Sequence, residues 1–166
     1  MTKEDFLKGV ANWDNHRYLL WEALEATIGD VVEMGIGQGS TPFLHWYCAD
    51  TNRQLFSYEN DPAYCESFKH LCTNPCHRLT LVTNWDVVFN EHKMPDVVLI
   101  DHAPGERRVI DIMKYASFAK IIVAHDTEPA ADHGYQMSKA WPLFKYRKDF
   151  KSEGAWATMV SNFVKL

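Results

Sequence analysis

Short apolar runs alternate with helical patterns along most of the chain, and this rhythm predicts a sheet whose strands are separated by helices. The runs at 95–101 and 119–124 are almost continuously apolar, which is typical of strands covered on both faces of a parallel sheet. Shorter runs at 30–34, 53–59 and 78–83 predict three further strands. We therefore expect five parallel strands.

Helices are expected in the intervals. Apolar residues in the segment 18–27 recur at helical spacing, and Asp14 or Asn15 is expected to cap this helix. Ser40 begins a second predicted helix, and Asp61 is interpreted as the cap of a third.

The C-terminal part of the chain has a different pattern. A helix is predicted at 107–115, whereas the segment 129–135 has a composition poor in helix formers and is expected to form a loop. Alternating residues at 143–150 and 156–163, separated by a turn-like sequence, predict an antiparallel hairpin.

The order of these elements predicts an α/β fold, a Rossmann-like three-layer sandwich with a mostly parallel sheet closed by a C-terminal antiparallel hairpin. A chain of 166 residues with 46% hydrophobic and 13% aromatic residues can bury one sizeable core. We expect a single domain, 1–166, with an N-terminal helical segment at 1–29 and an α/β core at 30–166.

Charge and apolar content narrow the range of partners. The net charge is −5, and no run of basic residues is longer than a pair such as Arg107-Arg108, which argues against nucleic acid as a general partner. The sequence has no signal-peptide pattern and no stretch near the roughly 20 apolar residues that span a membrane. We expect a cytoplasmic protein without membrane association and with reduced cysteines.

Between the first strand and the helix at Ser40, glycine stands at every second position of a loop. Glycines let the backbone approach a ligand closely, and the following helix presents free N–H groups to a polar or anionic ligand. The expected ligand contacts are Glu33, Gly35, Ile36, Gly37, Gly39 and Ser40. The alternative is a turn that only packs the helix onto the strand.

The stretch Glu33-Met-Gly-Ile-Gly-Gln-Gly39 resembles the E-x-G-x-G-x-G signature of class I S-adenosylmethionine-dependent methyltransferases, in which the loop cradles the methionine part and adjoining ribose of the cofactor. A dinucleotide fingerprint would require glycine at position 40, where this chain has Ser40. The spacing therefore favours S-adenosylmethionine over NAD.

Residues after the second and third strands match the expected path of this cofactor. Glu59 ends the second strand, where Rossmann-type folds place a carboxylate that binds the ribose hydroxyls, and Asn60 follows it. The resemblance also implies adenine contacts, with Trp85 against the face of the base and Asn84 at its edge. A core position is the alternative for Trp85.

Acids and imidazoles follow the fourth and fifth strands, where ligands of open α/β sheets bind. These candidate catalytic residues are Asp101, His102, His125 and Asp126, and Asp101 is also a candidate cofactor contact. They allow a divalent-metal site, a general base or hydrogen-bond anchors for an acceptor, with His102 and His125 as the candidate bases. Alternatively, Asp101 and His125 only cap loops and hydrogen-bond each other.

Catechol-type O-methyltransferases have metal-binding acids at these two strand ends, and Asp101 and Asp126 resemble them in position. The resemblance implies a divalent cation such as magnesium on this pair. Pro104 stands where those enzymes have lysine, and Thr127 stands where they have asparagine. The resemblance therefore does not identify a general base or a third metal ligand in this chain.

Basic and aromatic residues near these motifs are further candidates. Arg107 or Arg108 would suit an anionic group on an acceptor, although Arg107 and Asp111 are also spaced to pair along a helix. Trp13 and His16 are candidates to line the same opening.

These motifs predict methyl transfer from S-adenosylmethionine to a small molecule, at oxygen. An NAD-dependent oxidoreductase and a non-catalytic nucleotide-binding module are the alternatives. The short loops predicted between strands are compatible with a homodimer in which a second subunit completes the acceptor pocket.

Overall fold

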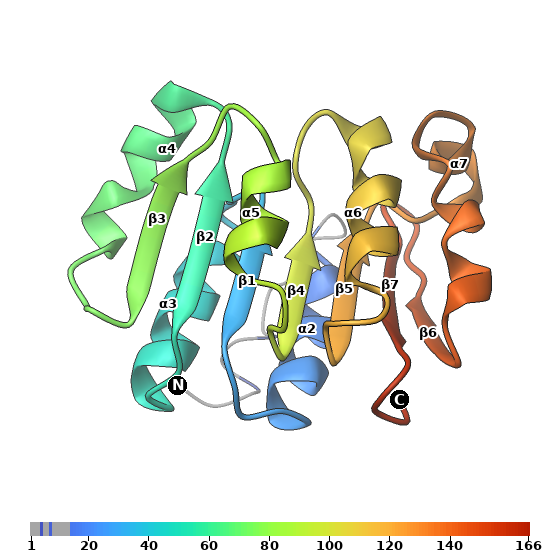
Figure 1. Ribbon diagram of the computed structural model, residues 1–166, viewed down its shortest axis with the longest axis horizontal. Coiled ribbons are helices and arrows are strands. Elements are labelled where there is room, and N and C mark those ends of the chain that lie inside the picture. The colour runs from blue at the N-terminus through green and yellow to red at the C-terminus, as the bar shows by residue number, and fades with distance from the viewer. Residues whose placement is uncertain (1–3, 5–6, 8–13) are drawn as a thin grey trace.

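A computed structural model describes residues 4, 7 and 14–166 (Figure 1). Its described residues contain seven strands, which form one sheet in the order β3-β2-β1-β4-β5-β7-β6. The strands are β1 (Val31–Met34), β2 (Leu55–Glu59), β3 (His77–Leu81), β4 (Val97–Ile100), β5 (Ile121–His125), β6 (Tyr146–Phe150) and β7 (Ala157–Ser161).

The first five strands are parallel and the last two reverse direction. In the centre, Val31 of β1 lies opposite Leu55 of β2 on one side and Val97 of β4 on the other. Strand β7 lies between β5 and β6 and pairs antiparallel with both, with Ala157 opposite His125. The predicted parallel sheet and its C-terminal hairpin are confirmed.

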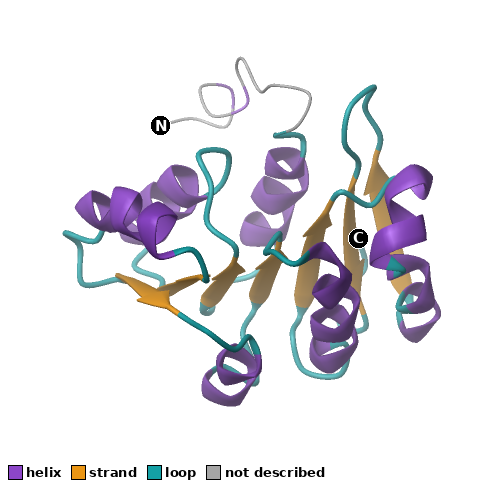
Figure 2. Cartoon of the chain, turned by 90° about the horizontal axis from the view of Figure 1, so that it is seen from above, coloured by secondary structure: helices purple, strands orange, loops and turns teal. Residues whose placement is uncertain are grey.

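Helices cover both faces of the sheet, which gives three layers (Figure 2). The helices are α2 (His16–Glu25), α3 (Thr41–Asp50), α4 (Pro62–Phe68), α5 (Asp86–Glu91), α6 (Arg108–Tyr115) and α7 (Pro129–Tyr135). Helices α2 and α3 pack on one face, whereas α5 and α6 pack on the other. The predicted three-layer sandwich is therefore confirmed.

Each face of the sheet has its own apolar core, because side chains alternate along a strand. In β4, Val97 and Leu99 join the cluster formed with α2 and α3, and Val98 and Ile100 join the cluster formed with α5 and α6. All four side chains are fully buried. This is the packing that their continuous apolar run predicts.

Two helices differ from the sequence-based expectation. The loop predicted at 129–135 is wrong, because this segment forms α7, with Pro129 in its first turn and the left-handed Gln136 (φ 55°) after its last residue. Helix α5, which has six residues, was not among the predicted elements. A segment this short is not long enough to show a helical period.

The two predicted caps have different outcomes. Asp61 caps α4 as predicted, because its Oδ1 accepts the Tyr64 N–H at 2.9 Å. Asn15 precedes α2, but its side chain makes no capping hydrogen bond and instead donates to Ser152 Oγ at 2.9 Å and to the Ala155 carbonyl. Asn15 thus ties the start of α2 to the turn between β6 and β7.

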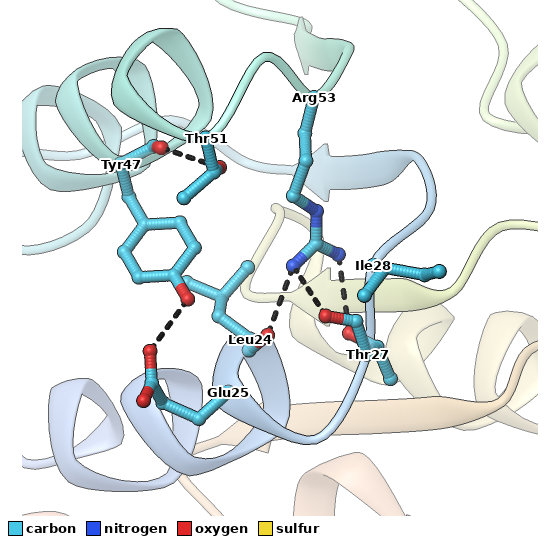
Figure 3. Close-up of a pocket in the computed structure, with 7 residues that line it drawn as sticks. All are labelled: Leu24, Glu25, Thr27, Ile28, Tyr47, Thr51 and Arg53. Carbon is cyan, nitrogen blue, oxygen red and sulfur yellow. Dashed lines mark hydrogen bonds between the residues drawn. The ribbon is translucent and has the colours of Figure 1, made fainter.

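A hollow of about 230 Å³ lies beside the ends of α2 and α3 (Figure 3). Arg53, next to β2, reaches across it and donates to the carbonyls of Leu24, Thr27 and Gly29. These bonds tie the last turn of α2 and the residues that follow it to Arg53. Arg53 therefore anchors α2 to the sheet, away from the carboxyl ends of the strands.

Among the helices in the described ranges, none has the length and apolar character needed to cross a membrane.

Candidate active site

The carboxyl ends of four parallel strands bring the predicted site residues to one edge of the sheet. Met34 at the end of β1 lies between Tyr58 of β2 and Ile100 of β4, and Ile100 lies opposite Ala124 of β5. The glycine loop, Glu59 and the acids and imidazoles of β4 and β5 follow these residues directly. Ligands of open α/β sheets bind at this edge.

The glycine loop begins with a residue that only glycine fits. Gly35 has a φ of +88°, and a Cβ atom there would lie 2.6 Å from backbone atoms of Asp101 and His102. Its N–H donates to the Tyr58 carbonyl at 2.9 Å. The loop therefore crosses directly over the end of β4, where any side chain would separate the two segments.

The other loop glycines have different surroundings. A Cβ atom on Gly37 would meet nothing closer than 4.0 Å, so the backbone there is open to a ligand. A Cβ atom on Gly39 would collide with the Asp14 carboxylate and lie 3.1 Å from Cε1 of His16. Arg17 also donates to the Gly39 carbonyl, at 2.6 Å. The start of α2 is therefore held against the loop.

Glu33 lies beneath the loop and is completely buried. Its Oε1 accepts hydrogen bonds from Ser40 at 2.6 Å and Thr41 at 2.9 Å, and its Oε2 accepts one from Ser57 at 2.6 Å. Burial raises the pKa of Glu33 to about 7, against the lowering effect of these three hydroxyls. Glu33 and Ser40 thus support the glycine loop from the side of the core.

Glu59 connects the loop to the end of β2. Its Oε2 accepts the Ile36 N–H at 3.3 Å, and its Oε1 accepts the N–H groups of Asn60 and Asp61 at 2.8 Å each. The Asn60 side chain donates to the Ala103 carbonyl at 3.1 Å. The carboxylate is thus fixed next to the loop, as its position at the end of the second strand suggested.

The two predicted adenine contacts lie at the start of α5. Trp85 is 5% exposed, its Nε1 donates to the Ala103 carbonyl at 2.9 Å, and its ring stacks on His102 with centroids 4.2 Å apart. Asn84 Oδ1 accepts the Asp86 N–H at 2.9 Å. Trp85 therefore packs mainly in the core. The contacts of Trp85 and Asn84 with adenine remain predictions.

His102 follows β4 but lies away from the other imidazoles. Its Nε2 lies 3.0 Å from Asp111 Oδ2 of α6, and neither side chain has exposed surface. Arg107 forms the predicted ion pair with Asp111, at 2.8 Å, and also pairs with Asp86. These contacts join β4, α5 and α6 in a polar cluster that runs from the buried His102 and Asp111 to the half-exposed Asp86. A catalytic role for His102 remains a prediction.

Asp101 and His125 form a close pair at the ends of β4 and β5. The His125 Nδ1 lies 3.3 Å from Asp101 Oδ1 and 3.5 Å from Asp126 Oδ1. Burial opposes the charged form of His125, but the hydrogen bond to Asp101 and the two acidic charges outweigh it and raise its pKa. Burial likewise opposes ionisation of Asp101, yet His125 and Arg108 hold its pKa below the usual value.

Arg108 joins the two acids predicted to bind a metal. Its Nη1 lies 3.1 Å from Asp101 Oδ1 and 3.0 Å from Asp126 Oδ2, and its Nε donates to the His102 carbonyl at 2.7 Å. A cation already balances this pair, so the geometry lends no support to magnesium between Asp101 and Asp126. The sequence carries no local signal for the arrangement, because Arg108 reaches the acids only through the packing of α6.

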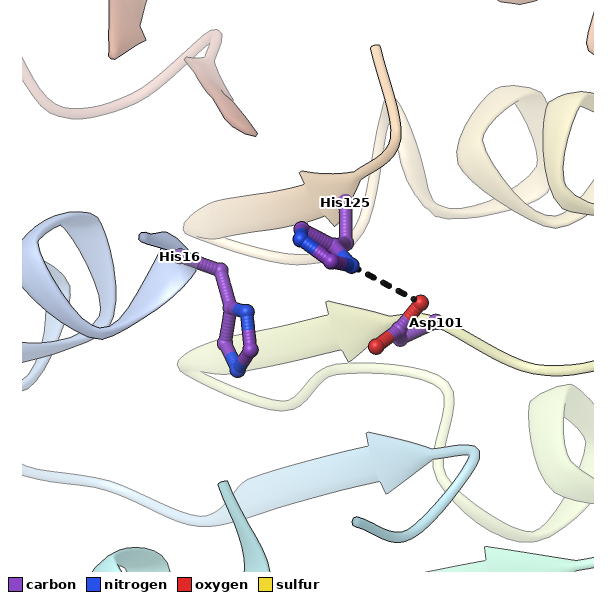
Figure 4. Close-up of side chains that lie close together, drawn as sticks. All are labelled: His16, Asp101 and His125. Atoms are coloured by element: carbon purple, nitrogen blue, oxygen red, sulfur yellow. Dashed lines mark hydrogen bonds and ion pairs between the residues drawn. The ribbon is translucent and has the colours of Figure 1, made fainter. Parts of the chain in front are cut away.

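His16 is the third member of the cluster (Figure 4). Its ring lies edge-on to that of His125, with centroids 4.6 Å apart, and it is 3% exposed. Burial, and then the neighbouring His125, lower the pKa of His16 to about 3. The structure places His16 against His125, and its expected position in an opening for the acceptor stays a prediction. Trp13 lies outside the described residues.

Comparisons with known proteins agree with this geometry at the level of the fold. No family model and no curated protein sequence matches the chain. A structure of cofactor-bound Rv0187 from MTB matches 95% of this chain and 84% of its own length, with a TM-score of 0.67 and 14% identity. This chain has a Rossmann-like methyltransferase fold.

Two other solved structures share this fold. A spermidine synthase in complex with the transition state analogue AdoDATO matches 90% of this chain, with a TM-score of 0.65 and 14% identity. This chain spans only 59% of that synthase's length. A methyltransferase from Pyrococcus furiosus matches 89% of this chain and 83% of its own, with a TM-score of 0.57 and 14% identity.

A second hollow lies beside the residues that follow β5. It has a volume of about 230 Å³, and its lining includes Thr127, the residue after Asp126 in the chain. Its lining also includes the aromatic side chains of Trp141 and Trp156 and the guanidinium of Arg147. Its volume lies below the roughly 300 to 1,000 Å³ of pockets for drug-sized ligands, so only a small organic group would fit it.

Proposed function

We propose that the chain transfers a methyl group from S-adenosylmethionine to an oxygen atom of a small molecule. The observation that carries this proposal is the joint position of the glycine loop, Glu59 and Asp101 at one edge of the sheet. Gly35 lies against the end of β4, and the Ile36 N–H of the same loop donates to Glu59 at 3.3 Å. The methyltransferase fold of the solved structures supports the same donor.

The loop and Glu59 suit two polar parts of this cofactor, its methionine part and its ribose. The open backbone at Gly37 can receive the methionine part, and the Glu59 carboxylate can accept hydrogen bonds from both ribose hydroxyls. Bound S-adenosylmethionine supplies a methyl group on a positively charged sulfur. The nearby Asp101 carboxylate favours a positive charge at this edge.

The acceptor would reach the methyl group from the side of β5. Asp101, His125 and Asp126 gather there, and they supply the groups that orient a hydroxyl and receive its proton. The hollow lined by Thr127, the residue after Asp126 in the chain, would hold the rest of the acceptor. Its volume and the net charge of −5 favour a small molecule over a nucleic acid.

Calorimetric titration with S-adenosylhomocysteine, and separately with NAD, tests the donor site. We expect micromolar binding of S-adenosylhomocysteine alone, and Glu59→Gln is expected to weaken it by about tenfold or more, because one charged acceptor is lost. Asp50→Ala, exposed at the end of α3, is the matched control and should bind as the wild type does. Binding of NAD instead, or of neither ligand, would overturn the proposal.

A second assay separates an enzyme from a non-catalytic binding module. Labelled S-adenosylmethionine is incubated with hydroxylated small molecules, and transfer of the label is measured. Asp126→Asn should reduce transfer while S-adenosylhomocysteine still binds. Transfer to nitrogen acceptors alone would contradict oxygen as the methylated atom.

A further inference from the structure

We propose that His16, Asp101 and His125 form a binding site for a divalent transition-metal ion such as Zn²⁺ or Fe²⁺. The three residues come from the start of α2 and from the ends of β4 and β5 (Figure 4). One ligand atom from each residue lies within 4.8 Å of the other two. The site therefore differs from the Asp101 and Asp126 pair that the sequence suggested.

Unpaired nitrogen atoms point to a ligand at this place. Within the described ranges, neither ring nitrogen of His16 nor Nε2 of His125 has a hydrogen-bond partner. The two residues are only 3% and 7% exposed. A buried polar atom without a partner lowers the folding stability by about 1 to 3 kcal/mol. An ion that accepts the lone pairs of these nitrogens would remove this loss.

The donor types select the class of metal. Two imidazole nitrogens and one carboxylate oxygen suit zinc and iron(II), whereas magnesium prefers an octahedral set of oxygen atoms. Metal–ligand distances of about 2.0 to 2.2 Å would put neighbouring ligand atoms roughly 3.3 Å apart. Binding would therefore draw the three side chains slightly closer together.

The surroundings hold two of the three ligands in place. Arg108 pairs with Asp101 at 3.1 Å, and Asp101 in turn lies 3.3 Å from His125 Nδ1. The contact with Asp101 occupies Nδ1 of His125, and Nε2 of the same ring is unpaired among the described residues.

The location of the site suggests what the ion does, and this step rests on the proposed methyl transfer. Three protein ligands leave a position for an acceptor oxygen, and His16 lies against Gly39 of the cofactor loop. An acceptor hydroxyl bound to the ion would have a lowered pKa and would pass its proton to Asp126, the acid of this edge that is not a ligand. The acceptor oxygen then bonds to the methyl carbon as the carbon–sulfur bond breaks and sulfur keeps the electron pair.

Titration of the chelator-treated chain with Co²⁺ tests the site directly, because the visible spectrum of Co²⁺ reports its ligands. We expect one ion per chain, displaced by Zn²⁺ and not by Mg²⁺ at the same concentration. His16→Gln and Asp101→Asn preserve side-chain size and are each expected to weaken Co²⁺ binding by at least about tenfold. Thermal unfolding followed by circular dichroism confirms that each variant is folded.

Two control variants locate the ion. Asp126→Asn should keep Co²⁺ binding, because this carboxylate lies near His125 but is not one of the three ligands. His45→Ala should also keep it, although it removes another close histidine contact, that of His45 with His77, whose Nδ1 atoms are 3.0 Å apart.

Two results would overturn the metal site. One is a folded wild-type chain that binds no Co²⁺, and the other is binding that survives His16→Gln but is lost in His45→Ala. S-adenosylhomocysteine binding is measured in a separate titration. The metal site and the proposed function can therefore fail independently.

Discussion

Ser57 of β2 donates a hydrogen bond of 2.6 Å to Oε2 of Glu33 in the neighbouring strand β1. This contact helps to hold a completely buried carboxyl group under the glycine loop. Burial nevertheless dominates and raises the pKa of Glu33 from 4.5 to about 7. The stability of the protein should therefore respond to the protonation of this residue.

The first prediction concerns Glu33→Gln. Between pH 4.5 and about 7, the folded chain keeps a proton on Glu33 that the unfolded chain has lost. The contribution of this group to the free energy of unfolding therefore falls as pH rises, by about 3 kcal/mol in total. We expect the variant to gain stability relative to the wild type over this range, measured by urea unfolding. A difference that is independent of pH would contradict this assignment.

The second prediction concerns His77 and has the opposite sign. Burial, and then the neighbouring His45, lower the pKa of His77 from 6.5 to about 4. Between these values the unfolded chain binds the extra proton, so the wild type loses stability as pH falls, by about 3 kcal/mol from this group. His77→Gln should flatten the urea-unfolding profile between pH 6.5 and 4. An unchanged slope would show that other groups set the acid sensitivity.

The third prediction compares two glycines. Gly35→Ala should destabilise the protein by at least about 2 kcal/mol, because φ is +88° and the new Cβ would lie 2.6 Å from the backbone of Asp101 and His102. Gly134→Ala in α7 meets no atom within 4 Å and should raise stability by up to about 1 kcal/mol. Denaturant unfolding of both variants measures the contrast, and equal effects would argue against the close crossing at Gly35.

The fourth prediction concerns the buried guanidinium at the site. Arg108→Met leaves Asp101 and Asp126 without their shared cation, and we expect a loss of about 2 to 3 kcal/mol in unfolding free energy. Arg147→Met is the matched control, because this exposed side chain pairs with Asp149 on β6 and should contribute less than about 1 kcal/mol. Similar losses in the two variants would mean that the ion pairs of Arg108 contribute little to the free energy of unfolding.

Local patterns were sufficient to predict most of the elements. The apolar runs predicted the five parallel strands because both faces of the sheet are covered, and alternation predicted the hairpin of β6 and β7. Helix α7 was missed because its composition is a weak guide, whereas its packing beside Gly105, through Tyr135, depends on the rest of the fold.

The sequence by itself determined the strand–loop–helix motif at Glu33 to Gly39 and the strand ends that carry Glu59, Asp101 and His125, because these features depend on neighbours in the chain. Only the tertiary structure decided which side chains meet. Arg108 balances Asp101 and Asp126, and His16 crosses from α2 to His125. Such contacts join residues far apart in sequence, and they form only when separate helices pack on the same edge of the sheet.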